Sequence, residues 1–382
     1  TAQTTGAVGM ASGGPTISGT TAQVTAALVT AETRITAGSA KVTLTNDPTG
    51  AELAAINPKT SGTITLADTA QNFSGTATQL AAAFDGFGTN ALTGTITITG
   101  AAPSPSELKT ISDATSGAIT LPSTNFTLSA SSSVLADALS GNFTNYAGNV
   151  TLTDAAPSAA NLAIINNKTS GTITLNANDA TFSGTAADLS AAFAGGLVGT
   201  QTGAVTVTDT SGTIAATTLS SIGEQTDGVV TAASGGITIS GTAAEVTDAL
   251  VTTGSLVVAS NADVTITDTG SVAATVLSAI GAKTGGVVTC SGALTITGTT
   301  AEITDALVTT NSLVVASSAN VTFGDDPTAA QLAAINTAVG GTITLNDDTQ
   351  TFSGTASDVA AAFAGGLANT QSGAVTITDT TG

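Results

Sequence analysis

Hydrophobic and polar positions recur along this chain with a fixed period that alternates short strands with short helices. An apolar residue, two small or polar residues and a Thr or Ser precede a run with helical apolar spacing, and this segment occurs seven times. Three positions after the Thr or Ser, six of the seven copies carry Gln, Glu or Asp, as in a capping box or its Asp variant. The seven residues that we expect to begin these helices are 54 to 57 positions apart: Thr20, Thr76, Ser131, Thr185, Thr242, Thr299 and Thr355.

A second element lies between these segments and begins with an alternating Val-Thr-x-Thr strand. The helical run after it carries Leu-x-x-Ile in all six complete copies, which places both apolar residues on one helical face. Each helix is followed by another strand-like run. Strand, helix and strand make a coil of about 27 residues, and two coils make a double unit of about 56 residues. The leucines of the motif are Leu53, Leu108, Leu162, Leu219, Leu277 and Leu332.

Helices and strands of this length are marginal alone, so we expect neighbouring copies to stack. The pattern predicts an α/β repeat solenoid of about fourteen strand–helix–strand coils, with parallel β-sheets and a layer of short helices. The alternative is a row of separate β-α-β-β-α-β mini-domains, although no linker separates the copies. We predict one continuous solenoid over residues 1–382, without a capping repeat at either end, as a window or protomer of a longer rod.

One pairing of apolar residues recurs in the segments that contain the seven expected helix caps. The apolar residue of the strand and the last apolar residue of the helix are always 11 positions apart, and where one is Phe the other is also Phe. Matched size at a fixed spacing indicates direct contact in a core. It also indicates two variants of the coil, one with Phe and one with Ile or Leu. The expected aromatic contacts are Phe73 with Phe84, Phe182 with Phe193, and Phe352 with Phe363.

Composition and charge limit the chemistry. Aromatic residues are 3% and charged residues 8% of the chain, and Gly occupies 43 positions, which favours a thin, regular β-rich fold over a thick core. The chain has no His and a single Cys, Cys290, so a disulfide within the chain and a thiolate zinc site are excluded. The net charge of −20 and the lack of an apolar run of about 18 residues argue against nucleic-acid binding and membrane insertion.

Carboxylates are the remaining reactive groups. Asp154, Asp209, Asp268 and Asp379 each follow a Thr-x-Thr strand, where a helix N-terminus would stabilise them. The alternative reading makes the first three calcium ligands at coil corners, together with Asp325, Asp326, Asp347 and Asp348, although an EF-hand loop is missing. We find neither a paired-acid cleft pattern nor a nucleophile with a base, so we expect no enzyme activity and no resident cofactor.

The Thr-x-Thr strands suggest a hydroxyl-bearing face. Alternation places both Thr side chains on one side of the sheet and the intervening apolar residue on the other. A solvated face of good β-formers explains the pattern. Regular Thr-x-Thr arrays also resemble the ice-binding face of some β-solenoid antifreeze proteins, so ice binding is an alternative.

Phrases such as Thr-Ile-Thr-Asp-Thr-Gly-Ser-Val-Ala-Ala-Thr and Gly-Thr-Ala-Ala-Glu-Val-Thr-Asp-Ala-Leu recur with small changes over nearly the whole chain. They resemble Ala/Thr/Gly/Ser-rich arrays in surface proteins of marine bacteria, notably cyanobacteria, and in structural or fibre proteins of their phages. The resemblance implies a structural role in an extracellular rod, filament or fibre, at a cell or virion surface. An adhesin or receptor-binding fibre with a glycan or cell-surface ligand is the alternative.

The two ends of the sequence predict self-association. Residues 1–19 carry no charged side chain, and residues 372–382 carry only Asp379. Uncharged strand edges invite another strand to add. We therefore expect end-to-end homo-oligomers, or membership of a longer rod, because a head-to-tail contact propagates unless it closes.

Overall fold

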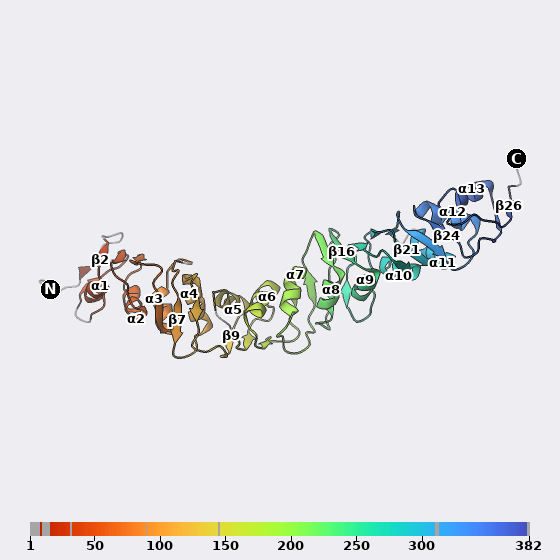
Figure 1. The fold of residues 1–382 in the computed structure, drawn as a ribbon. Helices are drawn as coiled ribbons and strands as arrows, with labels where there is room; N and C mark the ends of the chain where they lie inside the picture. Colours follow the sequence, from red (N-terminus) through yellow and green to blue (C-terminus); the bar gives the residue numbers. More distant parts are fainter. Residues whose placement is uncertain are drawn as a thin grey trace. The chain divides into compact units, whose positions relative to one another are not determined.

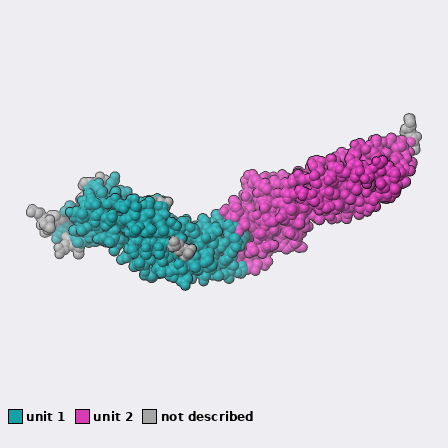
Figure 2. Space-filling view, in the orientation of Figure 1, with its two compact units in different colours: residues 1–180, 191–199 teal, residues 181–190, 200–382 magenta. Residues whose placement is uncertain are grey.

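The computed structural model describes residues 8–9, 16–30, 33–89, 91–143, 146–309 and 313–379. The chain divides into two compact units, drawn in different colours in Figure 2. The first holds residues 1–180 and 191–199, and the second holds 181–190 and 200–382. Every sheet described below lies within one of these units.

Short helices follow one another along each unit (Figure 1). In the first unit they are α1 (Thr21–Leu28), α2 (Gly50–Ile56), the 3-10 turn η1 (Asn57–Lys59), α3 (Ala77–Phe84), α4 (Pro105–Ala114), α5 (Ser132–Leu139) and α6 (Ala159–Lys168). Helix α7 (Ala186–Phe193) has residues in both units. In the second unit they are α8 (Ala216–Gly223), α9 (Ala243–Leu250), α10 (Ala274–Gly281), α11 (Thr300–Leu307), α12 (Ala329–Ala338) and α13 (Ala356–Phe363). Each helix packs against the next in the series α1 to α6 and α8 to α13.

The strands form small sheets in which all pairs are parallel. The first unit contains β1 (Val8–Gly9) with β3 (Ile35–Thr36), then β2 (Ile17–Gly19), β4 (Val42–Leu44) and β5 (Ile64–Thr65), then β6 (Phe73–Thr76), β7 (Ile96–Thr99) and β8 (Ile119–Thr120), and then β9 (Leu128–Ala130), β10 (Val150–Leu152) and β11 (Ile173–Thr174).

The sheets of the second unit follow the same scheme. They are β12 (Phe182–Gly184), β13 (Val205–Val207), β15 (Val230–Thr231) and β17 (Val257–Val258), then β14 (Gly212–Ala215), β16 (Ile237–Gly241), β18 (Asp263–Ile266), β20 (Val288–Cys290) and β22 (Val314–Val315), then β19 (Ser271–Ala273), β21 (Thr295–Gly298), β23 (Asn320–Phe323) and β24 (Ile343–Thr344), and finally β25 (Phe352–Gly354) with β26 (Val375–Ile377). These parallel strands alternate with helices along the chain, which confirms the predicted α/β repeat architecture.

Strand pairing and helix spacing have different periods. Val42 pairs with Ile64, 22 residues later, and Val230 pairs with Val257, 27 residues later, with the other registers between these values. Successive helices begin 26 to 31 residues apart. Most coils, measured from strand to paired strand, are therefore shorter than the predicted length of about 27 residues. Because the helices are spaced more widely than the paired strands, the distance from strand to helix start grows from one coil of a sheet to the next. A sheet consequently runs for only two to five strands.

The strand pairs also join one double unit to the next. Val230 lies before the helix cap Thr242 and Val257 after it, yet the two residues pair. Sheets shared in this way favour stacked coils over separate mini-domains. A continuous solenoid over both units stays a prediction. The expected end-to-end association rests on residues 1–19 and 372–382, and most of these, 1–7, 10–15 and 380–382, lie outside the described residues.

The helix starts and the core follow the sequence pattern. The Leu and Ile side chains of all six Leu-x-x-Ile motifs are fully buried. Complete capping boxes form at four of the predicted caps, as at Thr242, whose hydroxyl accepts the Glu245 N–H while the Glu245 carboxylate accepts the Thr242 N–H. At Thr185 and Thr355 the hydroxyl accepts the N–H of an Asp three positions later. The helices that carry Leu-x-x-Ile add three capping boxes that were not predicted, at Thr49, Ser104 and Thr328.

Candidate functional site

The candidate aspartates at strand ends bind the beginnings of helices. Asp268 follows β18, and its carboxylate accepts the N–H of Ala243, the first residue of α9, at 2.6 Å. Asp209 accepts the Ala186 N–H of α7 at 2.7 Å. The remaining members of this series are Asp154 on Ser132 of α5, Asp325 on Thr300 of α11, Asp379 on Ala356 of α13 and, with an amide in place of the carboxylate, Asn46 on Thr21 of α1.

These hydrogen bonds join successive coils. Each acceptor stands 22 to 25 residues after the helix residue it binds, so it lies one coil further along the chain. A negative charge at this position also compensates the positive end of the helix dipole. The prediction that a helix N-terminus stabilises Asp154, Asp209, Asp268 and Asp379 is therefore confirmed, but the helix belongs to the preceding coil. Gly100 takes the equivalent position in the second double unit, with a φ of 85°.

The other calcium candidates lie apart from this series. The Asp347 carboxylate accepts the N–H and the hydroxyl of Thr349 at 2.8 and 2.7 Å, and these hydrogen bonds hold the pKa of the carboxyl below its usual value. Asp326 and Asp348 are exposed. Within the described ranges, no three His, Cys, Asp or Glu side chains gather where they could hold a metal ion. The structure thus places five of the seven candidate ligands as hydrogen-bond acceptors and does not bring the described candidates together.

The Thr-x-Thr strands present short columns of hydroxyl groups. In β7 the apolar residues are buried and both threonines exposed, as alternation predicts. Ser74, Thr97 and Thr120 lie side by side on neighbouring strands of one sheet. Ser129, Thr151 and Thr174 form the same column in the next sheet. Because the sheets have two to five strands, each column is equally short.

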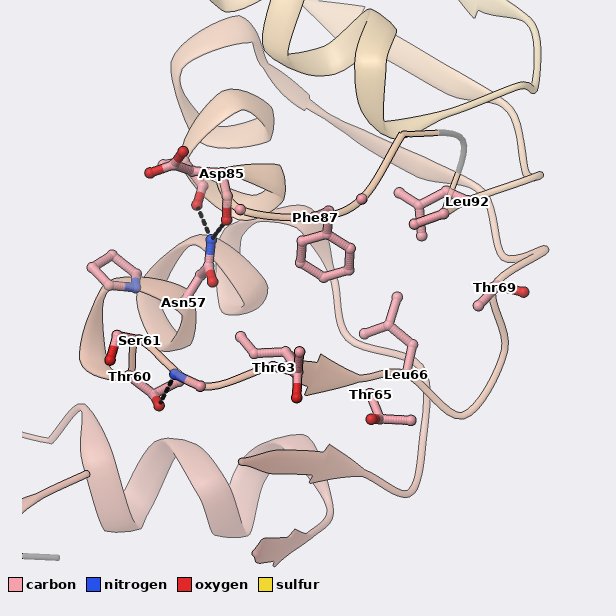
Figure 3. Close-up of a pocket in the computed structure, with 17 residues that line it drawn as sticks. Asn57, Thr60, Ser61, Thr63, Thr65, Leu66, Thr69, Asp85, Phe87 and Leu92 are labelled. Carbon is pink, nitrogen blue, oxygen red and sulfur yellow. Dashed lines mark hydrogen bonds between the residues drawn. The ribbon is translucent and has the colours of Figure 1, made fainter. Parts of the chain in front are cut away.

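A cavity of about 730 Å³ opens beside β5 in the first unit (Figure 3). Apolar side chains of Ile64, Leu66, Phe87 and Leu92 line it, together with the hydroxyl groups of threonines along and around the strand. At one side the Asn57 side-chain amide donates to the carbonyl oxygens of Ala82 and Asp85 at 3.0 and 2.7 Å, which fixes the end of α3. No pattern in the sequence predicted this cavity.

The cavity exists because one residue of the repeat is displaced. The residue four positions after the last apolar residue of the helix is Phe143, Leu197 or Leu367 in three other coils, and it bridges to Ile119, Ile173 or Ile343. These three isoleucines are fully buried. Gly88 takes this position beside Ile64, which is only half-buried. The aromatic residue stands one position earlier, and Phe87 turns back onto Phe84, with ring centroids 6.1 Å apart.

Two further polar side chains, Cys290 and Tyr146, are buried in the core. Burial, followed by the nearby charge of Asp268, raises the pKa of the Cys290 thiol to about 11. The thiol therefore stays protonated near neutral pH. Burial also raises the pKa of Tyr146 to about 12, and its hydroxyl donates to the Phe126 carbonyl at 2.6 Å. Cys290 is a small core residue with 5% exposure.

Fold and site together define an α/β repeat protein with solenoid-like coils, in which carboxylates link each helix start to the next coil. Comparison with models of protein families, with curated proteins and with solved structures finds no match to this chain. In the part of the chain that the structure describes, every helix is too short or too polar to cross a membrane.

Proposed function

We propose that this chain is a non-enzymatic structural protein that forms an extracellular rod, filament or fibre at a cell or virion surface. The observation that supports this role is the use of the acidic side chains. Asp154, Asp209, Asp268 and Asp325 bind helix starts across coils, so each of them stabilises the stacking of the repeat. A chain built this way suits spanning, coating or display.

The other polar contacts between coils serve the same purpose. Lys109 on α4 binds Asp113 of its own helix at 2.8 Å and Asp137 of α5 at 3.1 Å. The Thr78 hydroxyl of α3 donates to the Glu107 carboxylate of α4 at 2.6 Å. Each exposed contact contributes little alone, but repetition along a stack of coils adds them up.

End-to-end association is part of this proposal, and β26 supports it. Val375 and Ile377 are 48% and 50% exposed, whereas the equivalent Val205 and Val207 of β13 are buried. A further coil would remove this apolar surface from water, whether it came from a longer polypeptide or from a second copy. Association through two different surfaces is heterologous and produces filaments unless the contacts close into a ring.

Electron microscopy of the native material, with antibodies raised against the folded chain, tests the proposed function. We expect label along fibres or on the outer surface of cells or particles. Sedimentation over a wide concentration range should show growth of oligomers, which Val375→Lys with Ile377→Lys should suppress. Label confined to the cell interior would overturn the extracellular role, and concentration-independent monomers would overturn the association.

A receptor-binding fibre is the second candidate, because the cavity beside β5 opens to solvent. Specific binding on a glycan array would support it over a purely structural role. Ice binding is less favoured, since the hydroxyl columns stop after at most five strands and a broad flat array is not formed by the described sheets. Thermal hysteresis with ice shaping would reverse this ranking.

A further inference from the structure

The sheet that contains β5 lacks the parallel segment that bridges to β11 and β24, the edge strands of the equivalent sheets. Ile343 donates its N–H to the Gly366 carbonyl at 2.9 Å, and its own carbonyl accepts the Ala368 N–H at 2.8 Å. Ile173 makes the same two bonds, with Gly196 and Val198, at 2.6 and 3.0 Å. In both coils a Gly-Gly-Leu segment thus lies parallel to the strand and places its Leu beside the isoleucine.

The backbone of Ile64 is oriented for the same two bonds. Val42 of the neighbouring strand donates to the Thr63 carbonyl at 3.0 Å, so the groups of Thr63 face β4. Backbone groups alternate along a strand, and the N–H and C=O of Ile64 therefore face the opposite way, toward the cavity. In the described part of the following coil no group pairs with them. That coil instead closes two turns on itself, Phe87 N–H to Phe84 and Ala91 N–H to Gly88.

The side-chain position of the missing residue is also open. A Cβ atom at Gly88 would have no neighbouring atom within 4 Å. Leu66, Phe87 and Leu92 lie around the same space in Figure 3, and Thr63 and Thr65 also line the cavity. An apolar side chain that entered here would cover Ile64, as Leu197 covers Ile173 and Leu367 covers Ile343.

We infer that the cavity beside β5 binds an extended peptide that adds to the sheet as a parallel strand. The peptide residue before a Leu- or Phe-sized residue accepts the Ile64 N–H, and the residue after it donates to the Ile64 carbonyl, as Gly366 and Ala368 do for Ile343. The side chain between these two residues fills the cavity. Strand addition of this kind draws affinity from the main chain and specificity from the side-chain pocket. The chain's own segments at Phe143, Leu197 and Leu367 define this occupant. The exposed carboxylate of Asp85 at the rim disfavours an acidic peptide.

The probe is a blocked peptide with the sequence of residues 362–370, Ala-Phe-Ala-Gly-Gly-Leu-Ala-Asn-Thr. It is titrated into the full chain, with calorimetry for affinity and backbone NMR for location. We expect saturable shifts of the Ile64 and Thr65 amide signals. The peptide with Ala in place of Leu should bind at least about tenfold more weakly, because it leaves the cavity empty.

Two methylated peptides test the backbone bonds without changing the protein. N-methylation of the Ala after the Leu removes the donor to the Ile64 carbonyl and should abolish binding. N-methylation of the following Asn alters a group that points away from the strand and should leave affinity within about twofold. Equal binding by both methylated peptides would overturn strand addition.

Gly88→Leu tests the cavity from the protein side. The new side chain should occupy the space and lower peptide affinity at least about tenfold, whereas Gly254→Leu, at another open glycine in the second unit, should leave it unchanged. Unchanged binding by a folded Gly88→Leu protein, or shifts centred away from Ile64, would contradict the inference. If Gly88→Leu does not fold, the methylated peptides decide. The result does not depend on the proposed structural role.

Discussion

Phe73 and Phe84 meet edge to face, with ring centroids 5.1 Å apart and an interplanar angle of 79°. Phe352 and Phe363 repeat this geometry in the second unit, at 5.1 Å and 78°. Both predicted contacts are confirmed. The third pair, Phe182 with Phe193, stays a prediction because its residues belong to different units.

The contact between Phe73 and Phe84 should make a measurable contribution to the free energy of unfolding. Phe84 is 1% exposed, so Phe84→Ala should lower the free energy of unfolding of the first unit by about 3–5 kcal/mol. A double-mutant cycle with Phe73→Ala should give a coupling of about 0.5–1.5 kcal/mol, which chemical denaturation measures. Strict additivity of the two substitutions would show that the ring contact contributes nothing beyond burial.

The coil-linking carboxylates should have individual effects. Asp268→Ala removes the acceptor from the first N–H of α9 and should cost about 0.5–2 kcal/mol of stability in the second unit. Asp268→Asn keeps an acceptor and should cost less. Asp326→Ala, at an exposed carboxylate in the same unit, is the matched control and should stay within about 0.5 kcal/mol. Equal losses for Asp268→Ala and Asp326→Ala would contradict the linking role.

Gly117 marks a close approach of two coils. A Cβ atom there would collide with the carbonyl oxygen of Gly94 in the preceding coil, so Gly117→Ala should cost about 1–3 kcal/mol or more. Gly195→Ala in the same unit meets no atom within 4 Å and should be nearly neutral. Thermal unfolding of the two variants compares them directly, and similar midpoints would argue against close stacking at this corner.

The raised pKa of Tyr146 predicts that the folded protein loses stability at alkaline pH. Its pKa rises from about 10 in the unfolded chain to about 12 in the fold, because burial disfavours the phenolate. The stabilisation is complete below pH 10 and is lost as pH rises toward 12, by at most about 1.4 kcal/mol per pH unit. Phenolate absorbance reports this residue alone, since the chain has one Tyr and no Trp. Tyr146→Phe should remove this part of the alkaline loss, and an ordinary titration midpoint near 10 would refute the raised pKa.

Cys290 provides a probe of the second unit. It is 5% exposed and its pKa is raised to about 11, so the folded protein should react with thiol reagents far more slowly than the unfolded chain. The reaction rate over a denaturant series should follow the unfolding of this unit. Rapid labelling of the native protein would show that the strand β20 opens more easily than its burial indicates.

Local features of the repeat could be predicted because their causes are local. The Thr242 cap and its Glu245 partner are three residues apart, and Leu53 and Ile56 share one helical face by spacing alone. Phe73 and Phe84 lie in one strand and the helix that follows it, so matched size along a short segment sufficed to pair them.

Contacts between coils required the tertiary structure. Asp268 lies between β18 and β19 in sequence, and only the stacking of coils brings it to the N-terminus of α9, 25 residues earlier. The cavity beside β5 depends on the position of Phe87, where a shift of one residue sends the side chain to the other side of the backbone. The repeated sequence by itself determined the elements and their buried faces, since these follow from spacing within a few residues. The coil length, the partner of each aspartate and the open place beside Ile64 were decided by the fold, because they depend on which residues meet one full coil apart.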